Sequence, residues 1–365
     1  MRKRTRRRRH RQRINLNKLA FLCLVLSIVT VCGFFSVPRM LLNRIQNYSR
    51  TEQAAKTEET TEQRTETEKY YNNLPSVSHK FSSKYDDITK LENDAKSNLD
   101  SVENDGKISS EDYSSKNITA TFGCVNLRNT TKDVKVNIQD YLNKEIVANV
   151  EKDKPVVLVY HTHISESYQI SENEFYSKYL FANEENFGVL RAGDALCDTI
   201  ESYGYKVIHD KTVYDTSFSG AFDRSRDNIS KILRENPSIQ IVIDLHRDSI
   251  TRKDGTKVKT VTEIDGKKVA QIQITAGCEN GIVTGFPNWE KNLTFAIHLQ
   301  NALALSYPKV TRPIFFCARK YNLDLVPCAV NVDIGTEANT VREAVYSAEL
   351  LGEAVVKVLK ECEKL

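Results

Sequence analysis

The chain has no cysteines at the spacing of a zinc finger or of a dithiol redox motif. Two of its eight cysteines lie in an apolar run near the N-terminus, and the other six are scattered through apolar segments (Cys124, Cys197, Cys278, Cys317, Cys328 and Cys362). This distribution excludes cysteine-based metal and redox motifs. It favours small core residues over a disulfide framework, although an extracytoplasmic location would permit bridges.

Acidic residues are absent from the first 18 positions, which carry ten lysines and arginines. Because the formal net charge of the whole chain is +4, the remaining residues carry a net charge of −6. A mildly acidic body argues against an extended nucleic-acid surface, so we expect no nucleic-acid partner.

Charge of either sign is absent from residues 19–37, LAFLCLVLSIVTVCGFFSV. A helix of this length spans roughly 28 Å, close to the hydrocarbon thickness of a bilayer. A cleaved signal peptide is the alternative, but no Ala-x-Ala-like site follows the run. We therefore expect a basic cytoplasmic tail (1–18), an uncleaved transmembrane helix (19–37) and a single-pass protein of the cell membrane whose folded domain is extracytoplasmic.

Apolar periodicity is missing from residues 38–115, which are polar and charged. Such a segment buries too little apolar surface to offset the entropy of ordering it, so it is expected to be a disordered tether.

From residue 116 to 365 the pattern changes to strands that alternate with helices. Strand-like segments are 118–127, 134–142, 154–163, 205–210, 239–249 and 328–335; a hairpin is expected to turn at Asp265–Gly266 within 256–277. Amphipathic helices are expected at 187–204, 222–238 and 288–308, and a last helix opens with a capping box at Thr340 and Glu343. This alternation predicts an α/β domain with a mostly parallel, twisted sheet flanked by helices and one antiparallel excursion.

Polar side chains follow three of the expected strands, in LVYHTHISES, VIDLHRDS and VNVDIGTEANT. Open α/β sheets bind ligands at the carboxyl ends of their strands. The residues available there are His161, His163, Glu166, His246, Asp248, Asp333 and Glu337. Imidazoles and carboxylates are the usual ligands of catalytic zinc, and a further carboxylate serves as the base. His209, in VIHD, also ends a strand and is a candidate for orienting a ligand from behind.

The motifs YHTHISESY, YDTSFSGAFDRSRDNI, IVIDLHRDSI, YNLDL and IGTEANTVREA follow one another as in the stage II sporulation protein P family, which the chain resembles over about residues 116–362. The resemblance implies a zinc-dependent N-acetylmuramoyl-L-alanine amidase that also cleaves peptide crosslinks of peptidoglycan. It further implies a zinc-amidase-like catalytic domain, a role in septal wall degradation and engulfment of the forespore, and stage II sporulation proteins D and M as partners.

Carried over by motif, the resemblance implies His161, Glu166 and His246 as zinc ligands, with His163 as a rival to His161. Arg247 and Asp248 are expected to orient ligands or substrate. Where the family has a Glu-x-Gly element with the catalytic glutamate, this chain has Asp333, one methylene shorter, and Glu337 is a possible substitute. The alternative function is therefore a catalytically weakened relative that keeps zinc and acts as a peptidoglycan-binding scaffold; another zinc hydrolase with an extracellular substrate also remains open.

Overall fold

The computed structural model describes residues 85–97, 102–178 and 188–363. All of them lie in one compact unit, Glu68–Leu365. The expected basic tail (1–18) and transmembrane helix (19–37) lie outside the described residues, within which no helix is long and apolar enough to cross a membrane.

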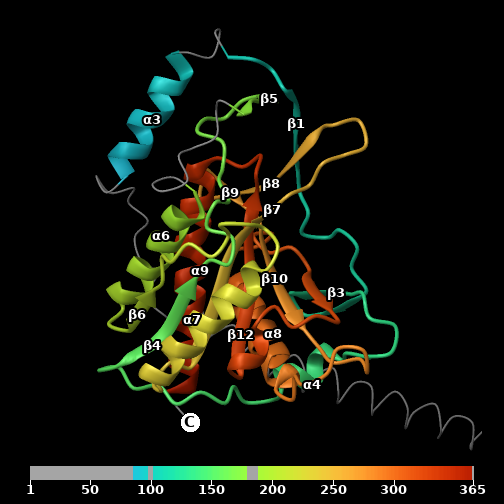
Figure 1. Cartoon of the computed structure of the whole chain (residues 1–365). Helices are drawn as coiled ribbons and strands as arrows, with labels where there is room; N and C mark the ends of the chain where they lie inside the picture. The colour runs from blue at the N-terminus through green and yellow to red at the C-terminus, as the bar shows by residue number, and fades with distance from the viewer. Residues whose placement is uncertain (1–84, 98–101, 179–187, 364–365) are drawn as a thin grey trace, which may run out of the picture. The chain divides into compact units, whose positions relative to one another are not determined.

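In the part of the chain that the structure describes, eight strands form the main sheet, in the order β2-β3-β11-β10-β12-β7-β4-β6 (Figure 1). Their bounds are β2 Ala120–Phe122, β3 Val125–Asn129, β4 Pro155–Tyr160, β6 Lys206–His209, β7 Ile241–Asp248, β10 Ile272–Gly277, β11 Ile314–Cys317 and β12 Cys328–Thr336. Within the described residues, five of the seven pairings are parallel; β2 pairs with β3, and β10 with β12, in the antiparallel sense. The predicted mixed α/β fold with a mostly parallel sheet and an antiparallel excursion is confirmed.

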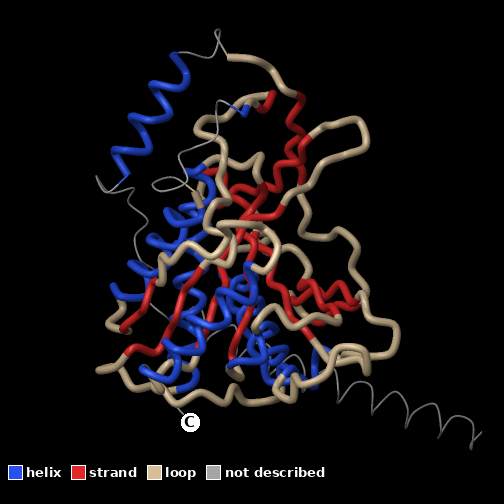
Figure 2. The backbone as a smooth tube through the Cα atoms, viewed as in Figure 1, coloured by secondary structure: helices blue, strands red, loops and turns tan. Residues whose placement is uncertain are grey.

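Helices cover both faces of this sheet, as Figure 2 shows. On one face α6 (Val189–Ser202), α8 (Trp289–Ser306) and α9 (Val341–Cys362) pack over the side chains of alternate strand residues such as Val159, Leu245 and Val332. On the other face α7 (Ala221–Glu235) packs over Leu158, Tyr160 and Val242. Because successive strand residues point to opposite faces, this division decides which side each polar residue faces at the strand ends.

A second sheet has the order β5-β1-β8-β9, with β1 Gly106–Glu111, β5 Phe175–Tyr176, β8 Lys257–Ile264 and β9 Lys267–Ala270. The predicted hairpin is confirmed: β8 and β9 are antiparallel, and Asp265 and Gly266 join them, both with positive φ. The capping box of α9 is also confirmed, since the Thr340 side chain accepts from the Glu343 N–H and the Glu343 carboxylate accepts from the Thr340 N–H.

The structure differs from the expected tether in part of 38–115. Helix α3 (Asp86–Ser97) buries Ile88 completely, and Arg342 of α9 binds the carboxylate of Glu92. Strand β1 of the second sheet also lies in this range. The polar composition therefore did not reveal that α3 and β1 are ordered by contacts with residues distant in the sequence.

A second difference concerns 134–142, expected as a strand. The structure has a short helix, α4 (Ile138–Leu142), at its end, because Ile138 and Tyr141 are spaced to bury one helical face. Within the described residues no cysteine forms a disulfide, and five of the six are buried, as small core residues are.

Candidate active site at the carboxyl ends of β4, β7 and β12

The three polar strand ends meet at one edge of the main sheet. Strand β7 lies between β4 and β12, and all three run parallel, so their carboxyl ends share that edge. Asp333 of β12 pairs with His246 of β7, which places these two side chains on the same face of the sheet.

Glu166 and His246 are in direct contact at this edge. The Glu166 Oε2 atom lies 3.2 Å from His246 Nδ1 and accepts a hydrogen bond of 2.9 Å from the Arg247 N–H. The ring of His163 lies beside them, with its centroid 5.5 Å from that of His246. Burial and the nearby His246 lower the pKa of His163. The segment after β4 therefore brings an imidazole and a carboxylate to the imidazole at the end of β7.

Behind His246 lies a buried carboxylate that sequence analysis missed. Asp244 Oδ1 is 2.9 Å from His246 Nε2, although this fully buried nitrogen makes no well-directed hydrogen bond. Asp244 accepts from the N–H of Thr162 at 2.9 Å and from its hydroxyl at 2.7 Å. The signal was available: in IVIDLHRD an aspartate two positions before the histidine shares its face and interrupts an otherwise apolar strand.

Charge interactions and hydrogen bonds within this group outweigh the effect of burial on the pKa values of Asp244 and His246. Burial alone would raise the pKa of Asp244, but His246 and the Thr162 hydrogen bonds outweigh it and hold that pKa below its usual value. Burial likewise acts to lower the pKa of His246, yet the carboxylates of Asp244 and Glu166 hold it well above the usual value.

His161 does not join this group. It is fully buried, with Nδ1 2.8 Å from the Leu245 carbonyl oxygen and Nε2 2.9 Å from His209 Nε2. His209 Nδ1 in turn lies 3.0 Å from Asp194 Oδ1. Burial and the neighbouring His209 lower the pKa of His161 to about 3. Both of its nitrogens are thus already engaged, on the face that α6 covers.

The close approach of these two imidazoles depends on a glycine in α6. A Cβ atom at Gly193 would lie 2.6 Å from His209 Nε2 and 2.8 Å from His161 Nε2. His209, expected to orient a ligand, therefore contacts His161 and does not reach the group at His246 in this arrangement.

Asp333 stands beside His246 in an unusual electrostatic environment. Burial raises its pKa to about 7; the carboxylate of Asp248 acts in the same direction, while His246 and Arg312 act against it. Arg312, a buried side chain that sequence analysis did not single out, donates to Asp248 Oδ2 at 2.7 Å and to Gln273 Oε1 at 3.3 Å. Arg312 precedes β11 and has no motif around it. It reaches Asp333 because its N–H donates to the Ile272 carbonyl of β10 and because β10 pairs with β12.

Glu337, the other candidate base, is buried and paired with cations. Its Oε1 atom accepts from Lys257 Nζ at 2.5 Å and its Oε2 atom from Arg247 Nη1 at 3.5 Å. Arg247 also donates from Nε to the Ser167 carbonyl at 2.9 Å. The bulge between Asp333 and Thr336, with Gly335 at φ +62°, separates Glu337 from the strand register that places Asp333 next to His246.

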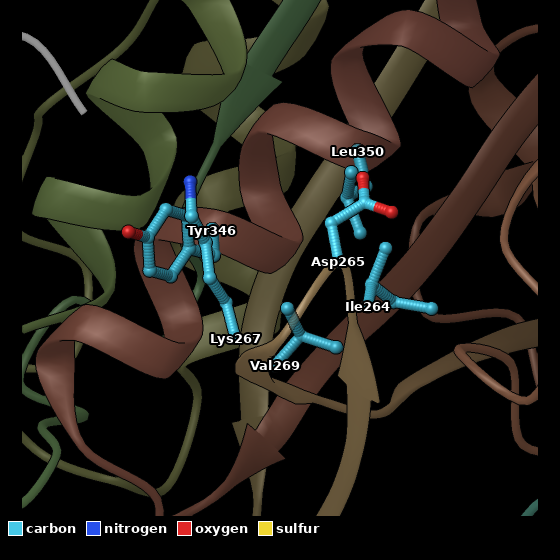
Figure 3. A pocket seen from close by; sticks show the side chains of 6 residues that line it. All are labelled: Ile264, Asp265, Lys267, Val269, Tyr346 and Leu350. Carbon is cyan, nitrogen blue, oxygen red and sulfur yellow. The ribbon is translucent and has the colours of Figure 1, made fainter. Parts of the chain in front are cut away.

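Within the described residues, no three His, Cys, Asp or Glu side chains converge as a formed metal centre. A cavity of about 20 Å³ lies between the β8–β9 hairpin and α9 (Figure 3). It is lined by Ile264, Asp265, Lys267, Val269, Tyr346 and Leu350, none of which belongs to the group at the strand ends.

Among solved structures, the chain is similar to the CwlD amidase of Clostridioides difficile in complex with the GerS lipoprotein, with 11% identity and a TM-score of 0.37 over 57% of this chain and 100% of that one. It is also similar to the apo form of the amidase Ami1 from Mycobacterium abscessus, with 12% identity and a TM-score of 0.35 over 57% and 98%. At these scores the likeness carries no conclusion about activity.

A curated relative, "Stage II sporulation protein P" of Bacillus subtilis (strain 168), is 26% identical over 226 residues, which are 58% of this chain. The chain spans about half the length of that relative (53%). The family model described as "Stage II sporulation protein P" matches residues 36–356, most of the chain. The family predicted from the motifs is thereby confirmed: the chain belongs to the stage II sporulation protein P family.

Proposed function

We propose that the protein is a zinc-dependent peptidoglycan hydrolase, an N-acetylmuramoyl-L-alanine amidase that also cleaves peptide crosslinks. The observation that carries the proposal is the grouping of His163, Glu166 and His246 beside Asp333 at the carboxyl edge of the sheet. Membership of the stage II sporulation protein P family supports the substrate class.

Imidazoles and carboxylates are the donors that zinc takes in proteins, and one pair of donor atoms at this edge already has the spacing that zinc would impose. Two donors held about 2.0–2.1 Å from one tetrahedral zinc lie about 3.3–3.4 Å apart. The observed separation of Glu166 Oε2 and His246 Nδ1 is 3.2 Å. The position of Asp244 next to the orphaned His246 Nε2 matches the carboxylate that commonly orients a ligating histidine.

His163 fits the third ligand position better than His161. Ligation by His161 would require it to give up its contact with the Leu245 carbonyl or with His209. The His163 ring packs against the rings of Phe218, Phe222 and His246, and it lies on the same side as His246. The proposed ligand set is therefore His163, Glu166 and His246, with His161 supporting the strand ends from the opposite face.

When bound, zinc supplies Lewis-acid polarisation of the scissile carbonyl and lowers the pKa of a bound water. Asp333 is the proposed general base: it takes a proton from the attacking water and returns it to the leaving amine. A pKa near 7 suits this role, because general bases work best when their pKa lies close to the operating pH. Asp248 raises the pKa of Asp333 and Arg312 lowers it, and these two side chains are hydrogen-bonded to each other. Glu337 is less suited to act as the base, because its carboxylate is paired with Lys257 and Arg247.

The proposal is tested by incubating the full chain, solubilised in detergent and loaded with zinc, with cross-linked peptidoglycan, and analysing the soluble products by mass. Release of stem peptides and of uncrosslinked peptides is expected. The Asp333→Asn variant should lose about 10²–10⁴-fold of the rate, the usual contribution of a general base. No release from the parent protein would overturn the proposal.

The alternative function is a peptidoglycan-binding scaffold, and it is motivated by Asp333, which is one methylene shorter than the family's glutamate. If the parent binds peptidoglycan without cleaving it and Asp333→Glu cleaves, the protein is a scaffold. Separate zinc measurements on His161→Ala and His163→Ala test the ligand set: zinc should be lost in the second variant and largely kept in the first.

The setting of the reaction is part of the same proposal. We propose anchorage in the cell membrane through 19–37, an extracytoplasmic domain, septal peptidoglycan of sporulating cells as substrate, and stage II sporulation proteins D and M as partners. Family membership supports each of these. Co-purification of D and M with the full chain from sporulating membranes, and its loss on deleting 19–37, would test them together.

A further inference from the structure

The segment between β6 and α7 displays an aromatic ring at the candidate site. Phe218 is 83% exposed, yet its ring is stacked on that of His163, with centroids 4.8 Å apart and planes inclined by 11°. One face of the Phe218 ring thus covers the imidazole, and the rest of the ring is open to solvent. A single exposed apolar residue is ordinary, so the argument rests on how this one is held.

The backbone around Phe218 is bound to a helix side chain. Arg224 of α7 donates to three carbonyl oxygens of the segment: that of Tyr214 at 2.5 Å, that of Ser219 at 3.1 Å, and that of Ser217. Each such charge-assisted bond is stronger than a neutral one. An exposed loop whose carbonyls are gathered by one guanidinium is pre-organised, and it presents the Phe218 ring in one place.

The same segment is bound to the chain that carries the proposed ligands. Asp215 Oδ2 accepts from the Ser165 N–H at 3.0 Å and from the Ser165 hydroxyl at 2.5 Å. Ser165 lies between His163 and Glu166 in sequence. The position of Phe218 relative to the proposed metal ligands is therefore set by hydrogen bonds on both sides.

The aromatic surface continues beyond Phe218. The Phe222 ring lies 5.7 Å from that of His163, and the Tyr321 ring lies 5.3 Å from that of Phe222. These rings therefore lie next to one another on the side of the site that α7 covers.

The chemistry of the segment favours a neutral, hydroxylated ligand. Residues 214–220, YDTSFSG, contain one acid and no base, and the arginine beneath them is committed to carbonyl oxygens. Stem peptides carry carboxylates, which would select a cationic surface. The exposed Thr216, Ser217 and Ser219 instead flank the ring with hydroxyl-bearing side chains, as suits a pyranose that has an apolar C–H face and polar edges.

We propose that Phe218 is the platform on which a sugar ring of the glycan strand rests while the adjoining amide bond lies against His163, Glu166 and His246. This inference rests on the proposed amidase function, in which a sugar carries the acyl side of the scissile bond. It makes Phe218 a residue that determines specificity for glycan-linked peptides.

The test uses the full chain in detergent with Asp333→Asn, so that ligand is bound and not consumed. Affinities are measured calorimetrically for a soluble disaccharide–tetrapeptide and for the same tetrapeptide without sugars. Phe218→Ala should weaken binding of the disaccharide–tetrapeptide by about 3- to 10-fold, the range that an aromatic stacking contact supports. Binding of the free peptide should be unchanged, and Phe218→Tyr and Phe218→Trp should retain the affinity of the parent.

Ile282→Ala is the matched control. Ile282 is 90% exposed and follows β10, whose carboxyl end points away from those of β4, β7 and β12. Equal weakening of both ligands by Phe218→Ala, no weakening of either, or no binding of the disaccharide–tetrapeptide to the Asp333→Asn protein would each overturn the proposal. Peptide release by the parent enzyme with an unaltered KM in Phe218→Ala would overturn the platform alone, whereas no release by the parent would overturn the amidase function itself.

Discussion

Replacing Asp333 by asparagine should make the metal-free protein more stable at alkaline pH while removing the proposed base. The carboxyl is desolvated at the edge of the sheet and lies near Asp248, and its pKa is raised from 3.8 to about 7. The folded state therefore holds the Asp333 proton more tightly than the unfolded chain does. The stability contributed by this group is full below pH 3.8 and is lost as the pH rises through about 7.

The size of the effect follows from the shift. A gap of about three pKa units corresponds to about 4 kcal/mol between the two protonation states. Of this, about 3 kcal/mol is lost between pH 5 and pH 8, because the unfolded carboxyl is already ionised at pH 5. An asparagine has no charge to bury, so the stability of Asp333→Asn relative to the parent should rise by about 3 kcal/mol over that interval.

Urea denaturation of both proteins at pH 5 and pH 8, in the presence of a chelator, measures this difference. Asp153→Asn, at an exposed position, is the control and should show the same stability difference at both pH values. If the difference between Asp333→Asn and the parent does not change with pH, the carboxyl is not desolvated as described, and the argument for a base with a pKa near 7 fails with it.

Three further outcomes are expected. Asp244→Asn should weaken zinc binding by about 10–100-fold, measured by competition with a chelator, because the carboxylate behind His246 no longer orients the ring; undiminished affinity would show that Asp244 has a purely structural role. Glu343→Ala should lower the free energy of unfolding by about 3–5 kcal/mol in urea, since it leaves Lys259, 2% exposed and 2.8 Å from the carboxylate, without its closest buried counter-ion. A smaller loss, below about 1 kcal/mol, would mean that water or a shifted side chain replaces it. Gly193→Ala should destabilise the protein by about 1–3 kcal/mol and lower its Tm, because the added Cβ would meet two imidazoles at 2.6–2.8 Å. The loss is expected even though alanine is the better helix former. An unchanged Tm would show that the imidazoles can move apart freely.

Much of the domain was accessible from local pattern. The period of apolar residues located β4, β7, β12 and the helices between them, and the turn residues located the β8–β9 hairpin. The Thr340–Glu343 capping box marked the start of α9. These features depend on residues a few positions apart, so the sequence is sufficient to place them. The motifs were likewise sufficient for the family.

Order within the expected tether was not accessible in the same way. Helix α3 is polar and short, and a helix of 12 residues is marginal in isolation. Contacts with the rest of the domain stabilise it: Ile88 is buried, and Glu92 binds Arg342, 250 positions along the chain. Such a long-range contact cannot be predicted from the composition of the segment.

The sequence by itself determined that two imidazoles and a carboxylate follow β4, and that a histidine and an aspartate lie near the carboxyl ends of β7 and β12. Only the tertiary structure decided which of them meet. Side chains alternate between the two faces along a strand, but this alternation stops where β4 ends at Tyr160. His161 therefore lies on the α6 face, whereas His163 lies on the face of His246. The same register brought Asp244 behind His246 and Asp333 beside it. Pairing across strands distant in the sequence is a property of the folded sheet, and it is this pairing that turns a list of polar residues into a site.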